Sequence, residues 1–209
     1  MKTRTGILIS GRGSNMASLI HAAGQPNYPA EIAIVISNRP DAPGLAIAGK
    51  YGIRVEVIAN AAYGGDRGAH EAAIDTALRN ADCTTVCLAG YMRLLTPFFV
   101  RRWEGSMLNI HPSLLPAFRG LNTHARALAA GVKIHGCTVH LVTEMMDEGP
   151  ILAQAATPVL PDDTEASLAE RVLALEHKIY PTALACHASG RPLPPPNKVR
   201  SLINPCVSC

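Results

Sequence analysis

The chain is poor in aromatic residues and has no strong excess of either charge. Only 4% of its 209 residues are aromatic, so a buried core has to consist mostly of Ala, Val, Leu and Ile. The formal charge of +3 is small and no run of Lys or Arg forms a basic patch, so we expect no nucleic-acid partner. Hydrophobic residues make up 48% and charged residues 17%, which excludes a disordered chain and indicates a folded one.

Long hydrophobic runs and complete metal-binding cysteine patterns are also missing. The apolar segment at 6–9 is too short for a secretory signal or a membrane-spanning helix, so we expect a cytoplasmic protein without a membrane partner. The 6 cysteines are scattered, and Cys206 and Cys209 have the spacing of only half a zinc site. We therefore expect reduced thiols and no metal.

Short apolar runs alternate with longer amphipathic stretches along most of the chain. We expect strands at 4–9, 31–37, 54–58, 84–89, 106–110, 136–142 and 150–158. We expect helices at 15–23, 43–51, 66–80, 96–103 and 164–186. This alternation predicts an α/β fold, with an open, mostly parallel twisted sheet and helices on both faces. We expect a single domain over residues 1–190 and a Pro-rich tail at 191–209.

The loop at 10–15, Ser-Gly-Arg-Gly-Ser-Asn, lies between the first predicted strand and the first predicted helix. A dinucleotide-binding fingerprint is excluded, because it requires Gly at the position of Met16 and an acidic residue within 37–39, where there is none. A Walker loop is excluded as well, because its Gly-Lys-Ser/Thr sequence is absent. Glycines let the backbone approach an anion, and amides at a helix start can donate to phosphate. Gly13, Ser14 and Asn15 therefore predict a monophosphate site, with a plain tight turn as the alternative.

Asn109 and His111 are two residues apart in a predicted strand, so their side chains point to the same face. An amide N–H and a protonated imidazole are suited to stabilising an oxyanion while a carbonyl carbon becomes tetrahedral. Asp147, in the acid-rich turn at 143–150, could orient His111 and favour its charged form. The alternatives are a structural Asn–His pair and a solvated Asp in a turn.

Several motifs in order resemble one family. They are the loop at 10–15, Leu-Ala-Gly-Tyr-Met-Arg-Leu-Leu-Thr-Pro at 88–97, Leu-Asn-Ile-His-Pro-Ser-Leu-Leu-Pro at 108–116, Thr-His at 123–124, His-Gly-Cys-Thr-Val-His at 135–140, Asp-Glu-Gly-Pro at 147–150 and Glu-His-Lys-Ile-Tyr-Pro at 176–181. Together they resemble the phosphoribosylglycinamide formyltransferases, also called glycinamide ribonucleotide transformylases, in the folate-dependent formyltransferase family. The resemblance runs from about residue 4 to residue 190.

The resemblance implies an enzyme of purine synthesis with a Rossmann-like fold. Its donor would be 10-formyltetrahydrofolate and its acceptor the amine of glycinamide ribonucleotide, which attacks the formyl carbon directly. The implied catalytic residues are Asn109, His111 and Asp147. The implied acceptor-site residues are Gly13, Ser14, Asn15 and Glu176. The implied folate-site residues are Arg67, Met92, Arg93, Leu94, Leu95, Asn109, Thr143, Glu144, Met145, Met146 and Asp147. The implied partners are small molecules, and the chain would be a monomer or a homodimer.

The sequence departs from the family pattern around residues 117–122. Ala-Phe-Arg stands at 117–119 where Lys-Tyr-Pro is more usual, and Asn122 stands where His is common, so the closing of a loop over the site is in question. A methionyl-tRNA formyltransferase is an alternative suggested by Leu-Leu-Pro followed by Arg119-Gly120. Enzymes of that class normally carry an extra C-terminal barrel, which we do not expect in this sequence. A sugar-nucleotide formyltransferase or a non-catalytic folate-binding module are further alternatives.

The remaining histidines carry weaker expectations. His21, His70 and His187 are expected on helix surfaces, and His124 is expected to line the loop near residue 120. His140, next to a predicted strand end, could face the pocket.

Overall fold

The computed structural model describes residues 1–191, and its seven strands form one sheet in the order β3-β2-β1-β4-β5-β6-β7. The strands are β1 (Thr3–Ile9), β2 (Ala30–Ser37), β3 (Val55–Val57), β4 (Thr85–Leu88), β5 (Met107–His111), β6 (Ile134–Leu141) and β7 (Ile151–Pro158). The helices are α1 (Ser14–Ala23), α2 (Pro43–Lys50), α3 (Arg67–Asn80), α4 (Pro97–Arg102), α5 (Thr123–Ala129) and α6 (Glu165–Ser189), with a 3-10 turn η1 (Asn60–Tyr63).

The first five strands pair in parallel, whereas β6 and β7 pair antiparallel. The predicted α/β fold with an open, mostly parallel sheet is confirmed. The predicted Pro-rich tail lies, beyond Arg191, outside the described residues.

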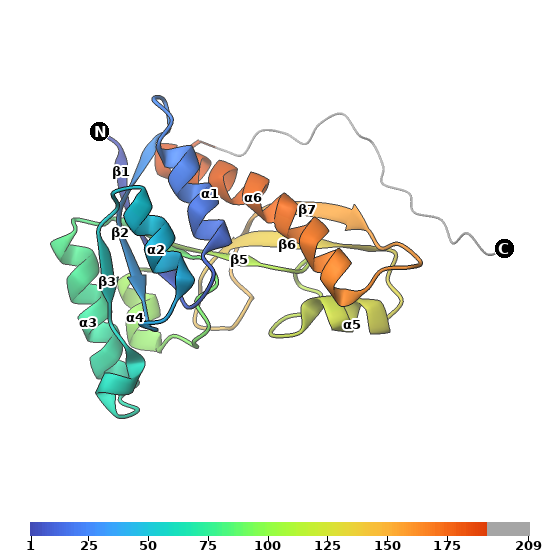
Figure 1. Ribbon diagram of the computed structural model, residues 1–209, viewed down its shortest axis with the longest axis horizontal. Helices are drawn as coiled ribbons and strands as arrows, with labels where there is room; N and C mark the ends of the chain where they lie inside the picture. Colours follow the sequence, from blue (N-terminus) through green and yellow to red (C-terminus); the bar gives the residue numbers. More distant parts are fainter. Residues whose placement is uncertain (192–209) are drawn as a thin grey trace.

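Alternate residues of β1 enter two different cores. Ile7 and Ile9 pack with residues of α1, α2 and α6, whereas Leu8 packs with residues of α3 and α4. Successive side chains of a strand point to opposite faces, so a strand covered on both faces needs apolar residues throughout. Figure 1 shows α1 and α6 lying together over one face of the sheet.

A threonine caps the start of both α4 and α6, where the sequence predicts Thr96 for the first helix and either Asp163 or Thr164 for the second. Thr96 Oγ1 accepts from Phe99 N at 3.4 Å, and Pro97 is the first residue of α4. Thr164 and Ser167 form a reciprocal capping box at the start of α6. These local signals fix where α6 starts, and therefore where along the helix its buried residue Glu176 lies.

The sheet has a switch point between β1 and β4. From β1 the chain moves outward to β2 and β3 and then returns to the other side of β1 with β4. At such a point the loops that follow the two strands leave toward opposite faces and open a crevice where ligands bind. The loop at 10–15 and the loop at 89–96 follow these two strands, so both predicted binding segments start at the same place.

Three segments differ from the sequence-based expectation. The helix α5 and the turn η1 are not predicted, because segments of 7 and 4 residues are too short to show a helical period. Strand β3 is shorter than the expected 54–58 and forms the sheet edge, where Val55 and Val57 are exposed. Within residues 1–191, no helix combines the length and apolar character needed to cross a membrane.

Candidate active site

The loop after β1 turns sharply into α1 at Gly13. Its φ of 73° is in the left-handed region, which favours glycine. A Cβ on Gly13 would lie 2.9 Å from Gly44 Cα, because the start of α2 packs against this loop. Within residues 1–191 no side chain caps α1, so the first amides of the helix, including those of Ser14 and Asn15, remain open to an outside acceptor. This geometry suits an anion.

Asn15 and Glu176 meet although 161 residues separate them in sequence. Asn15 Nδ2 donates to Glu176 Oε2 at 2.7 Å, and both residues are buried. Burial raises the pKa of Glu176, and the hydrogen bond from Asn15 partly offsets this rise. Among the described residues, Asn15 Oδ1 has no hydrogen-bond partner although it is buried. Such an atom is suited to accept a hydrogen bond from a ligand.

His111, the last residue of β5, has an oxygen atom facing each ring nitrogen. Nδ1 lies 3.5 Å from Asp147 Oδ2, and Nε2 lies 3.0 Å from the carbonyl oxygen of Phe118. Both oxygens can accept from the ring at once only when it is protonated. Asp147 therefore reaches His111 from the turn after β6, a contact that the sequence alone left open.

His140 lies opposite Asn109 in the register of β5 and β6. Its Nδ1 is 2.9 Å from the carbonyl oxygen of Leu141, so Nδ1 carries the proton of the neutral ring. Its Nε2 then accepts from Asn109 Nδ2 at 3.1 Å and lies 3.7 Å from Asp147 Oδ1. Burial lowers the pKa of His140, which is consistent with a neutral ring.

The contact between His140 and Asn109 adds a residue that the predicted site does not include. The only signal for His140 in the sequence is weak, namely its place near the end of a predicted strand. Only the pairing of β5 with β6 places it against Asn109. We conclude that His140 holds the Asn109 amide in one orientation.

The loop after β4 contains the predicted folate-site residues at 92–95. Arg67, the first residue of α3, donates from Nη2 to the carbonyl oxygen of Leu94 at 2.5 Å. Met92 and Leu94 are 70% and 65% exposed, whereas Leu95 packs partly against the core. The structure therefore brings Arg67 to this loop and leaves two apolar side chains open to a ligand.

The turn between β6 and β7 contains the other predicted folate-site residues, from Thr143 to Asp147. A Cβ on Gly149 would lie 1.7 Å from the carbonyl oxygen of Leu141, so only glycine allows the turn to close here. Asp147 has a φ of 56°, in the left-handed region, and its carboxylate lies beside His111 at the end of β5. Thr143 Oγ1 donates to the carbonyl oxygen of Met145 at 3.2 Å.

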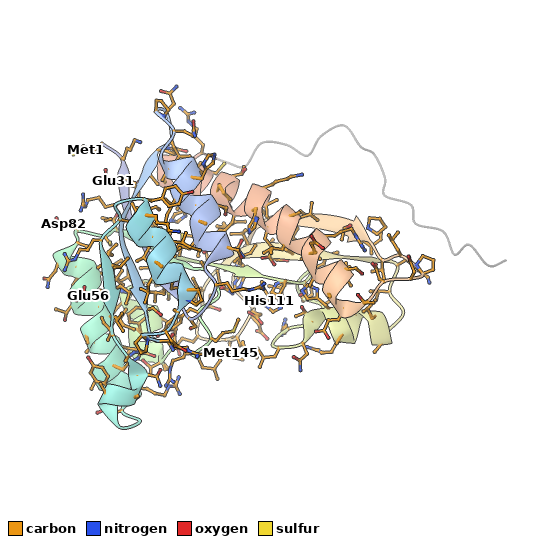
Figure 2. The ribbon with its side chains drawn as sticks, viewed as in Figure 1. Met1, Glu31, Glu56, Asp82, His111 and Met145 are labelled. Carbon is orange, nitrogen blue, oxygen red and sulfur yellow. The ribbon has the colours of Figure 1, made fainter. Side chains whose placement is uncertain are left out.

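Glu144 contacts α4 rather than the centre of the site. Arg101 Nε donates to its Oε1 at 2.6 Å, and this hydrogen bond lowers the pKa of Glu144. Met145 and Met146 remain 63% and 53% exposed, and Met145 lies at the same end of the sheet as His111 (Figure 2). Of this turn, Asp147 is the residue that contacts the two site histidines, His111 and His140.

The segment 117–122 covers the His111–Asp147 pair. Gly120 N donates to Asp147 Oδ2 at 2.8 Å, and Arg119 pairs with Glu148. Arg126 Nη1 donates to the carbonyl oxygen of Arg119 at 2.5 Å and its guanidinium lies over the Phe118 ring. Of the residues in which the sequence departs from the family pattern, Phe118 thus contacts His111, and Arg119 contacts the residue that follows Asp147.

Two further histidines lie next to this segment. His135 Nε2 is 3.2 Å from His124 Nδ1, and the Phe118 ring packs edge-on against His135. Burial, followed by the nearby His124 and His111, lowers the pKa of His135 to about 4, and burial lowers the pKa of His124 as well. His124 lies beside the loop as expected.

Comparison with known proteins decides the family. A family model described as "Formyl transferase" matches residues 3–184. A phosphoribosylglycinamide formyltransferase of Haemophilus influenzae is 41% identical over 185 residues, which cover 88% of this chain and 87% of the relative. The crystal structure of a phosphoribosylglycinamide formyltransferase from Brucella melitensis superposes with a TM-score of 0.87 at 55% identity, over 91% of this chain and 97% of that one.

The chain belongs to the phosphoribosylglycinamide formyltransferase family. This confirms the family resemblance found in the sequence. A longer human relative, "Trifunctional purine biosynthetic protein adenosine-3", is 50% identical over 189 residues, which are 90% of this chain and 19% of the relative. The chain thus spans about a fifth of the length of the trifunctional vertebrate relatives it matches.

One sequence-based expectation about a histidine is wrong. His70 was expected on a helix surface but is 2% exposed, and its Nε2 lies 2.8 Å from the carbonyl oxygen of Ile58. The turn η1 before α3, which the sequence does not predict, folds over this end of the helix, and Tyr63 packs edge-on against the His70 ring. Among residues 1–191, no three His, Cys, Asp or Glu side chains are grouped as metal ligands.

Proposed function

We propose that this member of the phosphoribosylglycinamide formyltransferase family transfers a formyl group from 10-formyltetrahydrofolate to the amine of glycinamide ribonucleotide in purine synthesis. The observation that carries the proposal is the convergence, at one end of the sheet, of an anion-binding loop, the Asn109–His111 pair and the Asp147 carboxylate. The donor supplies an activated formyl carbon when it is bound.

The residues near α1 fit a phosphorylated amine as the acceptor. The first amides of α1 with Gly13, Ser14 and Asn15 are suited to the phosphate. Glu176 and the unpaired Asn15 Oδ1 are suited to the N–H or O–H donors of the same molecule. The amides proposed for the phosphate and the Asn15 oxygen proposed for an N–H or O–H group therefore belong to neighbouring residues, so one small molecule could contact both.

The residues after β4 and β6 fit a flat, partly apolar donor with an acidic tail. Met92 and Leu94 on one loop, and Met145 and Met146 on the other, expose apolar side chains. The polar edge of a pterin ring would pair with backbone groups at 92–95, and Arg67 would attract the carboxylates of the glutamate tail.

Three side chains would carry the chemistry of direct attack. Asn109, held by His140, retains one amide N–H for the oxygen of the attacked carbonyl. When substrate binds, His111 Nε2 would leave the Phe118 carbonyl oxygen and donate a hydrogen bond to the same substrate oxygen. It would also take part in proton transfer. Asp147 would keep the imidazole oriented and stabilise its charge. No covalent bond to the protein is required in this scheme.

The test is a formyl-transfer assay with the purified protein, following the release of tetrahydrofolate with and without glycinamide ribonucleotide. Release that depends on the acceptor supports the proposal. Release without such dependence would indicate a hydrolase, and no release would exclude this donor and acceptor pair.

A pair of variants tests the role of His111. His111→Ala should lower kcat by about 100- to 1,000-fold, the range expected for a lost oxyanion donor and proton carrier, while acceptor binding changes little. His21→Ala, at an exposed position of α1, is the matched control and should retain full kcat. A His111→Ala variant with unchanged kcat would remove His111 from the mechanism.

We also propose that residues 1–190 form the catalytic domain and that the segment 192–209 is not needed for turnover. All of the proposed catalytic and binding residues lie before residue 191. A chain ending at Arg191 should therefore keep most of the activity of the full chain. A folded but inactive truncated protein would contradict this.

A further inference from the structure

Ser10 lies where the two proposed ligand-binding loops meet, but it belongs to neither set of proposed binding residues. It follows β1 directly and precedes the loop that leads to Gly13. It is 6% exposed, so its hydroxyl cannot be satisfied by bulk water and needs protein partners.

The Ser10 hydroxyl has a defined partner for its proton and another for its lone pair. Oγ donates to Asn38 Oδ1 at 2.7 Å, because an amide oxygen can only accept. Oγ in turn accepts from Met92 N at 2.8 Å. Ser10 thus connects the end of β2 with the first residue of the folate-binding segment at 92–95.

The position of Met92 explains why a side chain is needed there. The parallel pairing of β1 with β4 ends at Leu8 and Leu88, and the bond from Ser10 N to the carbonyl oxygen of Gly90, at 3.1 Å, extends it by one step. Strand β1 ends at Ile9, and the group that accepts from Met92 N is a side-chain hydroxyl and not a backbone carbonyl. The hydroxyl of Ser10 takes that place.

The same network reaches the folate-binding segment a second time. Asn38 Nδ2 lies 3.3 Å from the side-chain oxygen of Asn60. In its alternative amide orientation, Asn60 donates to the carbonyl oxygen of Asn38 and accepts from Arg93 Nη1 at 3.2 Å. In that orientation Asn38 is linked to Met92 through its side chain and Ser10, and to Arg93 through its carbonyl oxygen and Asn60.

We propose that Ser10 is a positioning residue for the folate donor. Its hydroxyl fixes the amide of Met92, and so sets the backbone at 93–95 in the conformation that the donor contacts. The proposal deepens the proposed function and rests on it for the identity of the donor.

The first test compares Ser10→Ala with Ser37→Ala. Ser37 is a buried serine at the end of the neighbouring strand, and its hydroxyl bonds only to the backbone of Arg39, at 2.8 and 3.1 Å, within the part of the chain described. Ser10→Ala leaves the Met92 amide without a partner. It should weaken tetrahydrofolate binding, measured by calorimetry, about tenfold, equivalent to about 1.4 kcal/mol. Ser37→Ala should change this Kd less than twofold.

Steady-state kinetics and hydrogen exchange separate positioning from a general loss of structure. In Ser10→Ala the KM for the donor should rise about tenfold while kcat and the KM for the acceptor stay within about twofold. Hydrogen–deuterium exchange of the Met92 amide should accelerate in Ser10→Ala and not in Ser37→Ala. If the two variants weaken tetrahydrofolate binding equally, or if Ser10→Ala binds it normally, the proposal is wrong.

A second variant covers the case in which Ser10→Ala does not fold. Asn38→Ala keeps the Ser10 hydroxyl but removes the group that fixes its orientation, so it should weaken tetrahydrofolate binding about threefold. An Asn38→Ala variant with the Kd of the unaltered protein would overturn the proposal in that case. Tetrahydrofolate binding and the exchange of the Met92 amide require no turnover. They therefore decide the role of Ser10 even if the protein is inactive with glycinamide ribonucleotide, a result that would reject only the proposed function.

Discussion

The buried histidine His135 makes a quantitative prediction about stability and pH. Its side chain is 1% exposed and contacts the Phe118 ring and His124, and the charge of His111 also acts on it. These surroundings hold its pKa at about 4 in the folded protein, compared with 6.5 for an exposed histidine. Between these two values the unfolded chain binds a proton that the folded chain does not.

The sign and size of the effect follow from proton linkage. A depressed pKa in the folded state gives a contribution to stability that is complete above about pH 6.5 and is lost as the pH falls toward 4. Between pH 7 and pH 5 the contribution of His135 to the free energy of unfolding should fall by about 2 kcal/mol. The lowered pKa values of His124 and His140 act in the same direction, whereas the raised pKa of Glu176 acts in the opposite one, so the contribution of His135 has to be isolated with a variant.

The assay is urea unfolding at pH 7 and pH 5, followed by the fluorescence of Trp103, the one tryptophan of the chain, which is 5% exposed. His135→Gln removes the titrating group. Any pH-independent destabilisation caused by the substitution cancels, because the free energies of unfolding at pH 7 and pH 5 are subtracted within the same variant. We expect the pH-dependent loss to be smaller by about 2 kcal/mol in His135→Gln. Equal losses in the two proteins would refute the assignment of a depressed pKa to His135.

Three other predictions concern the site and the sheet. Asp147→Asn should lower kcat by about 100-fold or more with little change in either KM, because the charge facing His111 is lost. A kcat equal to that of the unaltered protein in steady-state kinetics would contradict this. Glu176→Gln should raise the KM for the acceptor about tenfold and leave that for the donor unchanged, and an equal rise in both would argue against an acceptor-side position. Gly136→Ala should prevent stable folding, because its Cβ would lie 2.0 Å from the carbonyl oxygen of Ala155; a cooperative unfolding transition like that of the unaltered protein would contradict it.

Most secondary structure could be predicted because its signals are local. Thr96 and Thr164 mark helix starts by side-chain capping, and the apolar runs mark strands that are covered on both faces. Helix α5 and the turn η1 lack such signals, because each is too short for a period and is held by packing against α6 or α3.

The catalytic candidates were identified by motif, but their geometry was not. Alternation along a strand is enough to put Asn109 and His111 on one face. The approach of Asp147 to His111 depends on how the turn after β6 bends at Gly149, which a sequence does not specify by itself. The register of β5 with β6, which sets His140 against Asn109, is likewise a long-range property.

The sequence by itself determined the fold class, the family and the residue types available for chemistry, because these depend on local patterns and on motifs in order. Only the tertiary structure decided which of those residues meet. The contacts of Asn15 with Glu176 and of Ser10 with Met92 join segments 161 and 82 residues apart, and they exist because α6 packs on α1 and because β4 returns beside β1. Contacts of that kind arise from the packing of whole elements, and no local pattern encodes them.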